Sequence, residues 1–214
     1  MIAIVDYGMG NLYSVSKALE RLGVNYFLSS DTSELKKADG FILPGVGSFK
    51  DAMHILTELE LVEFLKEEAE NGKPILGICL GMQLLFEKSE ENGLTNGLGL
   101  LKGEIKKIPS QSLKIPHMGW NKLVFHHEHE LLKELNEDYV YFVHSYYAAT
   151  DKDVILASAE YGVQVPAVVG KGHILGTQFH PEKSSKLGMA ILKNFLSIVE
   201  GRSKENGIYN LSSH

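Results

Sequence analysis

The chain has 214 residues, 44% hydrophobic and 22% charged, which is enough material for one large α/β domain. Its formal net charge of −6 and its lack of any lysine and arginine block argue against a nucleic-acid or anionic-membrane partner. A single cysteine excludes an intrachain disulfide, and no apolar run is long enough to span a membrane.

The first quarter of the chain alternates short apolar runs with amphipathic segments. Residues 2–5 are an apolar run of one strand's length, and the chain becomes polar at residue 6. Together with the lack of a basic leader, this predicts a strand in a cytoplasmic protein. Further strands are predicted at 25–29 and 40–43, and helices at about 11–22, 31–37 and 49–56. This β-α-β-α-β order predicts a parallel sheet, whose ligand sites lie at the carboxyl ends of the strands.

Two glycine loops follow strands of this half. The loop at 8–10 lacks the third glycine of a dinucleotide-binding fingerprint, so that reading has little support. In the loop at 44–49, Gly45 and Gly47 remove side chains that would keep the backbone away from a ligand. We interpret this second loop as a source of backbone donors, with an ordinary turn as the alternative.

Residues 73–86 are the stretch that organises the chemistry: a predicted helix at 59–71 leads into a short apolar strand, a tight turn and a further helix. Cys79 lies at the turn in a Gly-x-Cys-x-Gly motif, where Gly77 and Gly81 permit a sharp connection like the nucleophile elbow of hydrolases. Such a turn places the thiol at the positive end of a helix, which stabilises a thiolate. A buried, inert cysteine is the alternative.

The second half of the chain has a different pattern. After a polar loop at 87–97, the apolar segments become short, which predicts antiparallel strands added to the parallel sheet, at 123–125, 139–143, 154–159 and 167–169. A Pro-led loop at 116–121 holds Trp120, interpreted as an exposed anchor rather than a core residue. The histidines at 126–129 have no second ligand cluster, so we expect a solvated loop and no metal site.

The last predicted strand, at 172–179, ends in His180-Pro181-Glu182. In an extended segment residues i and i+2 face the same way, so Glu182 can hold the imidazole of His180 and leave its other nitrogen for Cys79. Both strands belong to the same predicted sheet, so we predict a Cys-His-Glu triad for acyl transfer. The N–H of Leu80 and an N–H of the 45–47 loop would hold the oxyanion.

A final helix begins at Ser185, and the residues after 200 are polar. These patterns predict one domain over residues 1–200, followed by a polar tail over 201–214. The predicted fold is a three-layer α/β fold: a central, mostly parallel sheet with helices on both faces and additional antiparallel strands.

The motif at 77–83 with the His-Pro-Glu at 180–182 resembles the triad-type, class I glutamine amidotransferases, which hydrolyse glutamine through a cysteinyl thioester and pass ammonia to a synthase. Further motifs resemble the glutaminase subunits of imidazole glycerol phosphate synthase; they are DYGMGNL (6–12), PGVGSF (44–49), PHMGWN (116–121), YFVHSY (141–146) and HPEKSS (180–185). The resemblance runs over almost the whole chain.

This resemblance implies a heterodimer with a separate cyclase subunit of (β/α)₈ fold, which makes imidazole glycerol phosphate and an aminoimidazole carboxamide ribonucleotide in histidine biosynthesis. It implies L-glutamine as substrate and no cofactor. It also implies roles for single residues: an oxyanion hole from Val46 and Leu80, a partner interface at Trp120 and Lys183, and a glutamine pocket from Gly45, Gly47, Gln83, Glu91, Ser145 and Tyr146.

Two alternatives remain open from the sequence. A paralogous glutaminase subunit would carry the same triad and feed ammonia to another synthase, such as one acting on a surface-polysaccharide sugar. A non-enzymatic binding module of the related cysteine-elbow fold is the second, and the His-Pro-Glu motif speaks against it.

Overall fold

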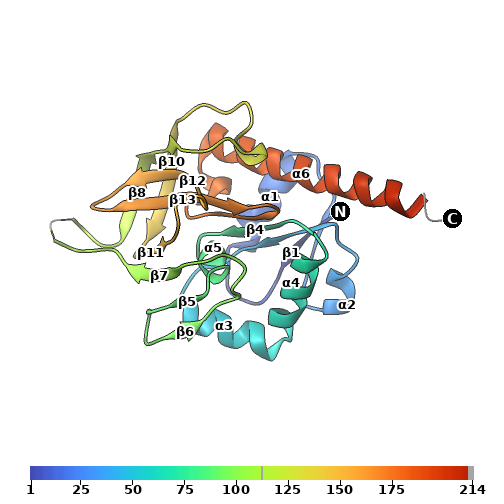
Figure 1. Ribbon diagram of the computed structural model, residues 1–214, viewed down its shortest axis with the longest axis horizontal. Helices are drawn as coiled ribbons and strands as arrows, with labels where there is room; N and C mark the ends of the chain where they lie inside the picture. Colours follow the sequence, from blue (N-terminus) through green and yellow to red (C-terminus); the bar gives the residue numbers. More distant parts are fainter. Residues whose placement is uncertain (112, 212–214) are drawn as a thin grey trace.

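A mixed sheet forms the centre of the molecule (Figure 1). The computed structural model describes residues 1–111 and 113–211. In this part, eight strands join in the spatial order β2 (Tyr26–Ser29), β1 (Ile2–Val5), β3 (Gly40–Leu43), β4 (Ile75–Ile78), β14 (Ile174–Thr177), β13 (Gln164–Lys171), β12 (Ile155–Glu160) and β9 (Val124–Phe125). Neighbours from β2 to β14 are parallel, and the last three strands are antiparallel.

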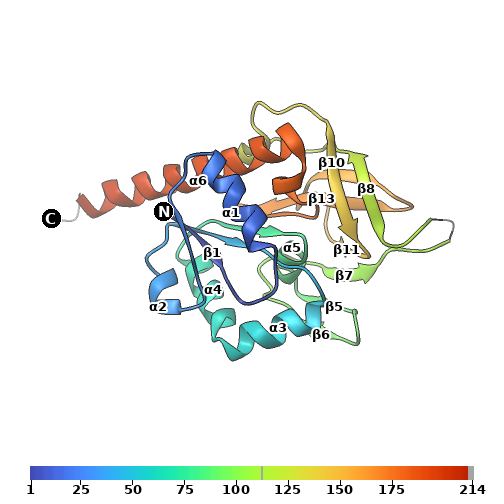
Figure 2. The ribbon, with the colours of Figure 1, turned by 180° about the vertical axis from the view of Figure 1, so that it is seen from behind.

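Helices cover both faces of this sheet, as the two opposite views show (Figures 1 and 2). One face packs against α1 (Leu12–Arg21) and α6 (Ser185–Leu211). The other packs against α2 (Thr32–Leu35), α3 (Phe49–Glu58), α4 (Leu61–Glu70) and α5 (Leu80–Leu84). Alternate strand residues serve the two layers, so Ile4 faces α1 while Val5 faces the α3 side. The predicted three-layer α/β fold is confirmed.

Side-chain caps fix where the first helices begin. Asn11 accepts the N–H of Ser14 at α1, Asp31 accepts that of Ser33 at α2, and Ser48 accepts that of Asp51 at α3. Each bond satisfies a backbone donor that the first turn of a helix leaves free. The predicted starts of these helices are therefore confirmed.

Two smaller sheets and two short 3₁₀ helices complete the second half. One sheet pairs β8 (His117–Lys122) with β10 (Tyr139–His144), and the other has the order β11 (Tyr146–Ala149), β7 (Glu104–Lys107), β5 (Lys88–Ser89), β6 (Thr95–Asn96). The 3₁₀ helices are η1 (Glu130–Leu132) and η2 (Pro181–Lys183).

The structure corrects four expectations. The segment 116–121 is not a loop, because residues from 117 onward form β8; the polar segment 87–97 contains β5 and β6. Only part of the second half joins the central sheet, since β7, β8, β10 and β11 lie in the smaller sheets. Residues 201–211, expected as a tail, continue α6.

Within the described residues, the helices include none with the length and apolar character that crossing a membrane requires.

Candidate active site

Cys79 stands at the turn between β4 and α5, in a backbone conformation that few side chains adopt. Its φ of 56° and ψ of −112° lie outside the helical and extended regions. A Cβ on Gly81 would lie 1.8 Å from the Leu43 carbonyl oxygen, and one on Gly77 would lie 2.5 Å from the Gly81 oxygen. The two glycines are therefore required for the turn that presents the thiol.

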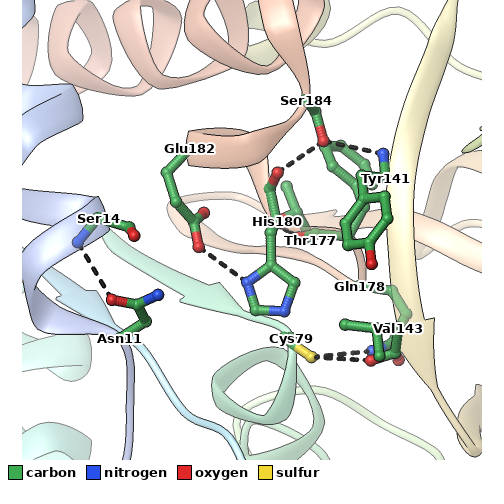
Figure 3. A network of polar contacts seen from close by, with 11 residues as sticks. Asn11, Ser14, Cys79, Tyr141, Val143, Thr177, Gln178, His180, Glu182 and Ser184 are labelled. Carbon is green, nitrogen blue, oxygen red and sulfur yellow. Dashed lines mark hydrogen bonds and ion pairs between the residues drawn. The ribbon is translucent and has the colours of Figure 1, made fainter. Parts of the chain in front are cut away.

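His180 follows β14, which is the parallel neighbour of β4 with Thr177 opposite Ile78. The two strands therefore deliver His180 and Cys79 to the same end of the sheet. The Nδ1 atom of His180 lies 2.8 Å from Oε1 of Glu182, and Figure 3 shows the other ring nitrogen turned toward the sulfur of Cys79. His180 and Glu182 come together through the 3₁₀ turn η2. The expectation of an extended segment is therefore wrong, although the predicted contact between the two side chains forms.

Burial and charge set the protonation of this pair. The side chains of His180 and Glu182 are 4% and 1% exposed. Burial of the imidazole favours its neutral form, but its interactions with Cys79 and Glu182 outweigh that effect and raise the pKa of His180 to about 10. At neutral pH the site therefore holds a charged imidazolium between a carboxylate and the sulfur, an arrangement that supports a thiolate nucleophile.

Two further groups contact the sulfur. Its Sγ atom lies 3.8 Å from the carbonyl oxygen of Val143 and 3.9 Å from Nε2 of Gln178 (Figure 3). The amide oxygen of Gln178 accepts a hydrogen bond of 3.1 Å from Gln83, which also donates to the carbonyl oxygen of Tyr146. This buried network fixes the amide of Gln178 so that its N–H₂ group faces the thiol.

The two groups expected to hold an oxyanion are arranged differently. The Leu80 N–H lies at the start of α5, where it donates to the Gly45 carbonyl oxygen at 3.3 Å. A trans peptide carries its C=O and N–H on opposite sides, so the Val46 N–H points away from Leu80. The Gly45 carbonyl thus occupies the Leu80 N–H, and the Val46 N–H is directed away from it.

A cavity of about 360 Å³ opens beside the triad. Its walls contain Cys79, His180, Val46 and Leu80, together with five of the six residues expected to bind glutamine: Gly47, Gln83, Glu91, Ser145 and Tyr146. The sixth, Gly45, does not line the cavity but precedes Val46, which does. Glu91 accepts a hydrogen bond of 3.3 Å from the Phe49 N–H, and burial raises its pKa, an effect that this bond opposes.

An exposed apolar face adjoins the site. On β8 the side chains of Met118 and Trp120 are 62% and 52% exposed, and Trp120 meets Tyr141 of β10 edge-on at 6.0 Å. The N–H of Tyr141 donates to Ser184, next to the exposed Lys183. Trp120 and Lys183 thus lie on one side of the cavity, where Trp120 is exposed as expected but belongs to a strand.

The histidines at 126–129 are tied to separate partners. Nε2 of His126 lies 2.6 Å from Oγ of Ser158, Nε2 of His127 lies 2.9 Å from the Lys152 carbonyl oxygen, and Nδ1 of His129 accepts the Leu131 N–H. Among the residues that the structure describes, no group of three His, Cys, Asp or Glu side chains is arranged to hold a metal ion.

Comparison with known proteins adds the family. The family model described as "Glutamine amidotransferase class-I" matches residues 3–199. The chain belongs to this family. It is 64% identical over 208 residues to "Imidazole glycerol phosphate synthase subunit HisH" of Geobacillus sp. (strain WCH70), covering 94% of this chain and 99% of that protein. It is 58% identical over 201 residues to the protein of the same name from Bacillus subtilis (strain 168), covering 91% and 95%.

Solved structures agree with this class I amidotransferase fold. A crystal structure of a glutamine amidotransferase superposes with a TM-score of 0.75 at 19% identity and covers 94% of this chain and all of that one. The structure of PurLQS from Thermotoga maritima gives 0.71 at 22% identity, over 92% and 98% of the two chains. At this identity the similarity concerns the fold alone.

The amidotransferase site contains residues that the sequence did not reveal. Gln178 precedes His180 by two positions on the same strand end, so the alternation of side chains could have identified it. His144 lines the cavity, and its Nε2 lies 2.8 Å from Nδ1 of the buried His117. No sequence spacing links these two histidines, because they meet only through the pairing of β8 with β10.

Proposed function

We propose that this chain hydrolyses L-glutamine to glutamate and ammonia as the glutaminase subunit of an imidazole glycerol phosphate synthase, in histidine biosynthesis. The observation that carries the proposal is the buried Cys79-His180-Glu182 arrangement at the wall of a cavity of about 360 Å³. The names of the relatives at 58–64% identity support the pathway. The intact triad argues against a non-enzymatic binding module.

The geometry supports a thioester mechanism. The Cys79 thiolate attacks the side-chain amide carbon of glutamine, and the carbonyl π electrons move to the oxygen. The His180 imidazolium then gives its proton to the amide nitrogen, so ammonia leaves as the C–N bond breaks and a thioester forms. Water next attacks the thioester while His180 takes a proton from it, and glutamate leaves as the sulfur departs as thiolate. Glu182 keeps the imidazole oriented throughout.

The cavity lining supports glutamine as the substrate. Glu91 is the acidic side chain in the wall and is suited to the substrate's α-ammonium group, while the polar groups of Ser145 and Tyr146 are suited to its carboxylate. Gln83 holds the Tyr146 backbone in place. Gly45 and Gly47 let the loop backbone approach the substrate amide.

The partner is a cyclase subunit of (β/α)₈ fold, and the two chains form a heterodimer. The exposed pair Met118 and Trp120 gives the apolar centre that a stable interface needs, and Lys183 gives a charge at its side. A surface beside the cavity also suits the transfer of ammonia directly into the partner. The free catalytic thiol supports a reducing, cytoplasmic location.

The loop conformation supports control by the partner. The Gly45 carbonyl fills the position of an oxyanion donor, so glutamine hydrolysis is slow until the Gly45–Val46 peptide turns over. Binding of the loaded cyclase would shift the population toward a state in which the Val46 N–H faces the substrate. Losing one oxyanion donor costs on the order of 10² to 10³ in rate, so control of that size is available.

The experiment measures glutamate release by the isolated chain, by its complex with the cyclase subunit of the same organism, and by that complex with its nucleotide ligand. We expect the third rate to exceed the first by about 100-fold. No glutamate from any of the three would refute the glutaminase. Equal rates in all three would refute the control by the loop and keep the glutaminase.

A further inference from the structure

Tyr7 is a buried residue next to the oxyanion loop whose role the triad does not explain. It follows β1, it is 3% exposed, and its hydroxyl donates a hydrogen bond of 2.8 Å to the carbonyl oxygen of Pro44. Burial, reinforced by the charge of Cys79, raises the pKa of Tyr7, so the phenol stays a neutral donor. A phenylalanine would fill the same space, so the hydroxyl must be explained by what it holds.

The Tyr7 hydroxyl holds the Pro44–Gly45 peptide, which directly precedes the Gly45–Val46 peptide. The Pro44 carbonyl belongs to the Pro44–Gly45 peptide, so the phenol fixes the orientation of that peptide. A Cβ on Gly45 would lie 2.6 Å from the Tyr7 hydroxyl and 3.1 Å from the Gly81 nitrogen. Gly45 therefore packs closely against both the phenol hydroxyl and the backbone of the elbow, with no room there for a side chain.

The next peptide is the one whose orientation decides the oxyanion hole. Turning the Gly45–Val46 peptide over changes ψ of Gly45 and φ of Val46 in opposite senses and can leave the preceding peptide where it is. Such a local rotation delivers the Val46 N–H to the position that the Gly45 oxygen now occupies only if the Cα atom of Gly45 stays in place. If Gly45 moves, the same rotation displaces the loop and misplaces the donor.

We propose that Tyr7 is a positioning residue that fixes Gly45 as the pivot of the oxyanion loop, so that the loop can exchange peptide orientation without leaving the elbow. This inference rests on the proposed glutaminase function. It assigns to the first loop of the chain, residues 6–11, a part in the rate of the acyl-transfer step. Because the phenol touches the loop and not the cavity walls, it acts on turnover and not on glutamine binding.

The test is Tyr7→Phe, which keeps the ring and removes only the hydroxyl. In the complex with the cyclase and its nucleotide ligand, we expect kcat for glutamine hydrolysis to fall about 10-fold, less than for complete loss of a donor. KM for glutamine should stay within about twofold, since uniform substrate binding is untouched. The matched control is Tyr26→Phe, which removes a hydroxyl that donates to Glu20 on the exposed side of the molecule and should leave kcat unchanged.

A second measurement separates positioning from a general structural role. Alkylation of Cys79 by iodoacetamide displaces iodide and forms no oxyanion, so its rate in Tyr7→Phe should equal that of the wild-type complex. The proposal is overturned if kcat is unchanged, if KM rises at constant kcat, or if alkylation slows in parallel with hydrolysis. Absence of glutamate release from the wild-type complex would instead refute the proposed function, so the two failures are distinct.

Discussion

The nucleophile and the oxyanion loop line the same cavity and are held in different ways. Cys79 and His180 follow neighbouring parallel strands, and the 2.8 Å contact between His180 and Glu182 is buried. The Gly45–Val46 peptide belongs to the loop after β3, which contains Gly45 and Gly47. Val46 in this loop is 46% exposed. The three side chains of the proposed triad are therefore brought together, while the Gly45 carbonyl occupies the Leu80 N–H of the proposed oxyanion hole.

This difference indicates where regulation is least costly. Moving a triad residue would disturb buried strands and leave a charged group without its partner, which costs several kcal/mol. Rotating the Gly45–Val46 peptide costs less, because the residue before it is a glycine with no Cβ to restrict its ψ angle. A glutaminase that depends on a partner can thus keep its nucleophile rigid and regulate the loop backbone beside it.

The largest expected effect comes from removing the nucleophile. Cys79→Ala should reduce glutamine hydrolysis by at least about a thousandfold without unfolding the chain, since the residue stands at a turn. Added ammonium salt should restore product formation by the complex, because the cyclase uses ammonia and not the thiol. Glutamate release at the wild-type rate in the alanine variant would remove the triad from the mechanism, and failure of ammonium to restore product would remove the ammonia-donor role.

The next effect ranks the two triad partners. His180→Ala should cost about as much as Cys79→Ala, because the imidazole handles every proton, whereas Glu182→Gln should cost roughly one to two orders of magnitude less. Steady-state kcat of the activated complex measures both, with thermal unfolding as the check that each variant is folded. Equal losses in two folded variants would contradict the division of roles.

The parallel half of the fold was predictable because its signals are local. Buried strands such as residues 40–43 are continuous apolar runs, and capping residues such as Ser48 begin the helices that cover them. The Gly-x-Cys-x-Gly spacing and the strand order then fix Cys79 beside His180. The placement of Cys79, His180 and Glu182 around one site therefore followed from sequence, even though the turn that joins His180 to Glu182 is a 3₁₀ helix.

The other half was less predictable because its pattern is inverted. On β8 the buried side chain is the polar His117, while Met118 and Trp120 face outward, so the alternation that identifies a strand points the wrong way. The partner surface that we propose on β8 would account for that inversion. The role inferred for Tyr7 depends on a contact with Pro44, which is far away in the chain, and spacing cannot reveal such a contact.

A smaller effect tests whether the apolar face connects the site to its partner. Trp120→Ala should weaken the complex with the cyclase by about 2 kcal/mol, or roughly 30-fold in Kd, because a half-exposed tryptophan at an interface centre is a typical hot spot. The melting temperature of the isolated chain should change little. Unchanged binding together with a large drop in melting temperature would assign Trp120 to the fold instead.

The smallest expected effect concerns the pair His117 and His144 at the wall of the cavity. His144 Nδ1 faces the Tyr146 carbonyl oxygen at 2.7 Å, so it carries the hydrogen and Nε2 accepts from His117 Nδ1. Asn121 donates in turn to the remaining nitrogen of His117 at 3.3 Å. Every hydrogen in this series of hydrogen bonds is therefore assigned with both imidazoles neutral. An added proton would place two N–H donors face to face with no acceptor between them.

Burial lowers the pKa of both His117 and His144 to about 4, from an ordinary 6.5. Between pH 6.5 and 4 the unfolded chain binds more protons than the folded one, so the free energy of unfolding falls as the pH falls through this window. His180, with its pKa raised to about 10, acts in the opposite direction and loses its stabilisation as the pH rises from 6.5 through 10. Stability should therefore be greatest near pH 6.5.

Replacing one histidine of the pair should flatten the acid side of this profile alone. In His144→Gln the side chain still accepts a hydrogen bond from His117 but no longer titrates, so the loss of unfolding free energy between pH 7 and about pH 5.5 should shrink by about 1 kcal/mol. Urea unfolding at a series of pH values measures it, with the exposed His54→Gln as the matched control. An acid side equally steep in both variants would mean that the pair does not titrate with folding, and that the wall of the cavity next to Tyr146 is insensitive to acid.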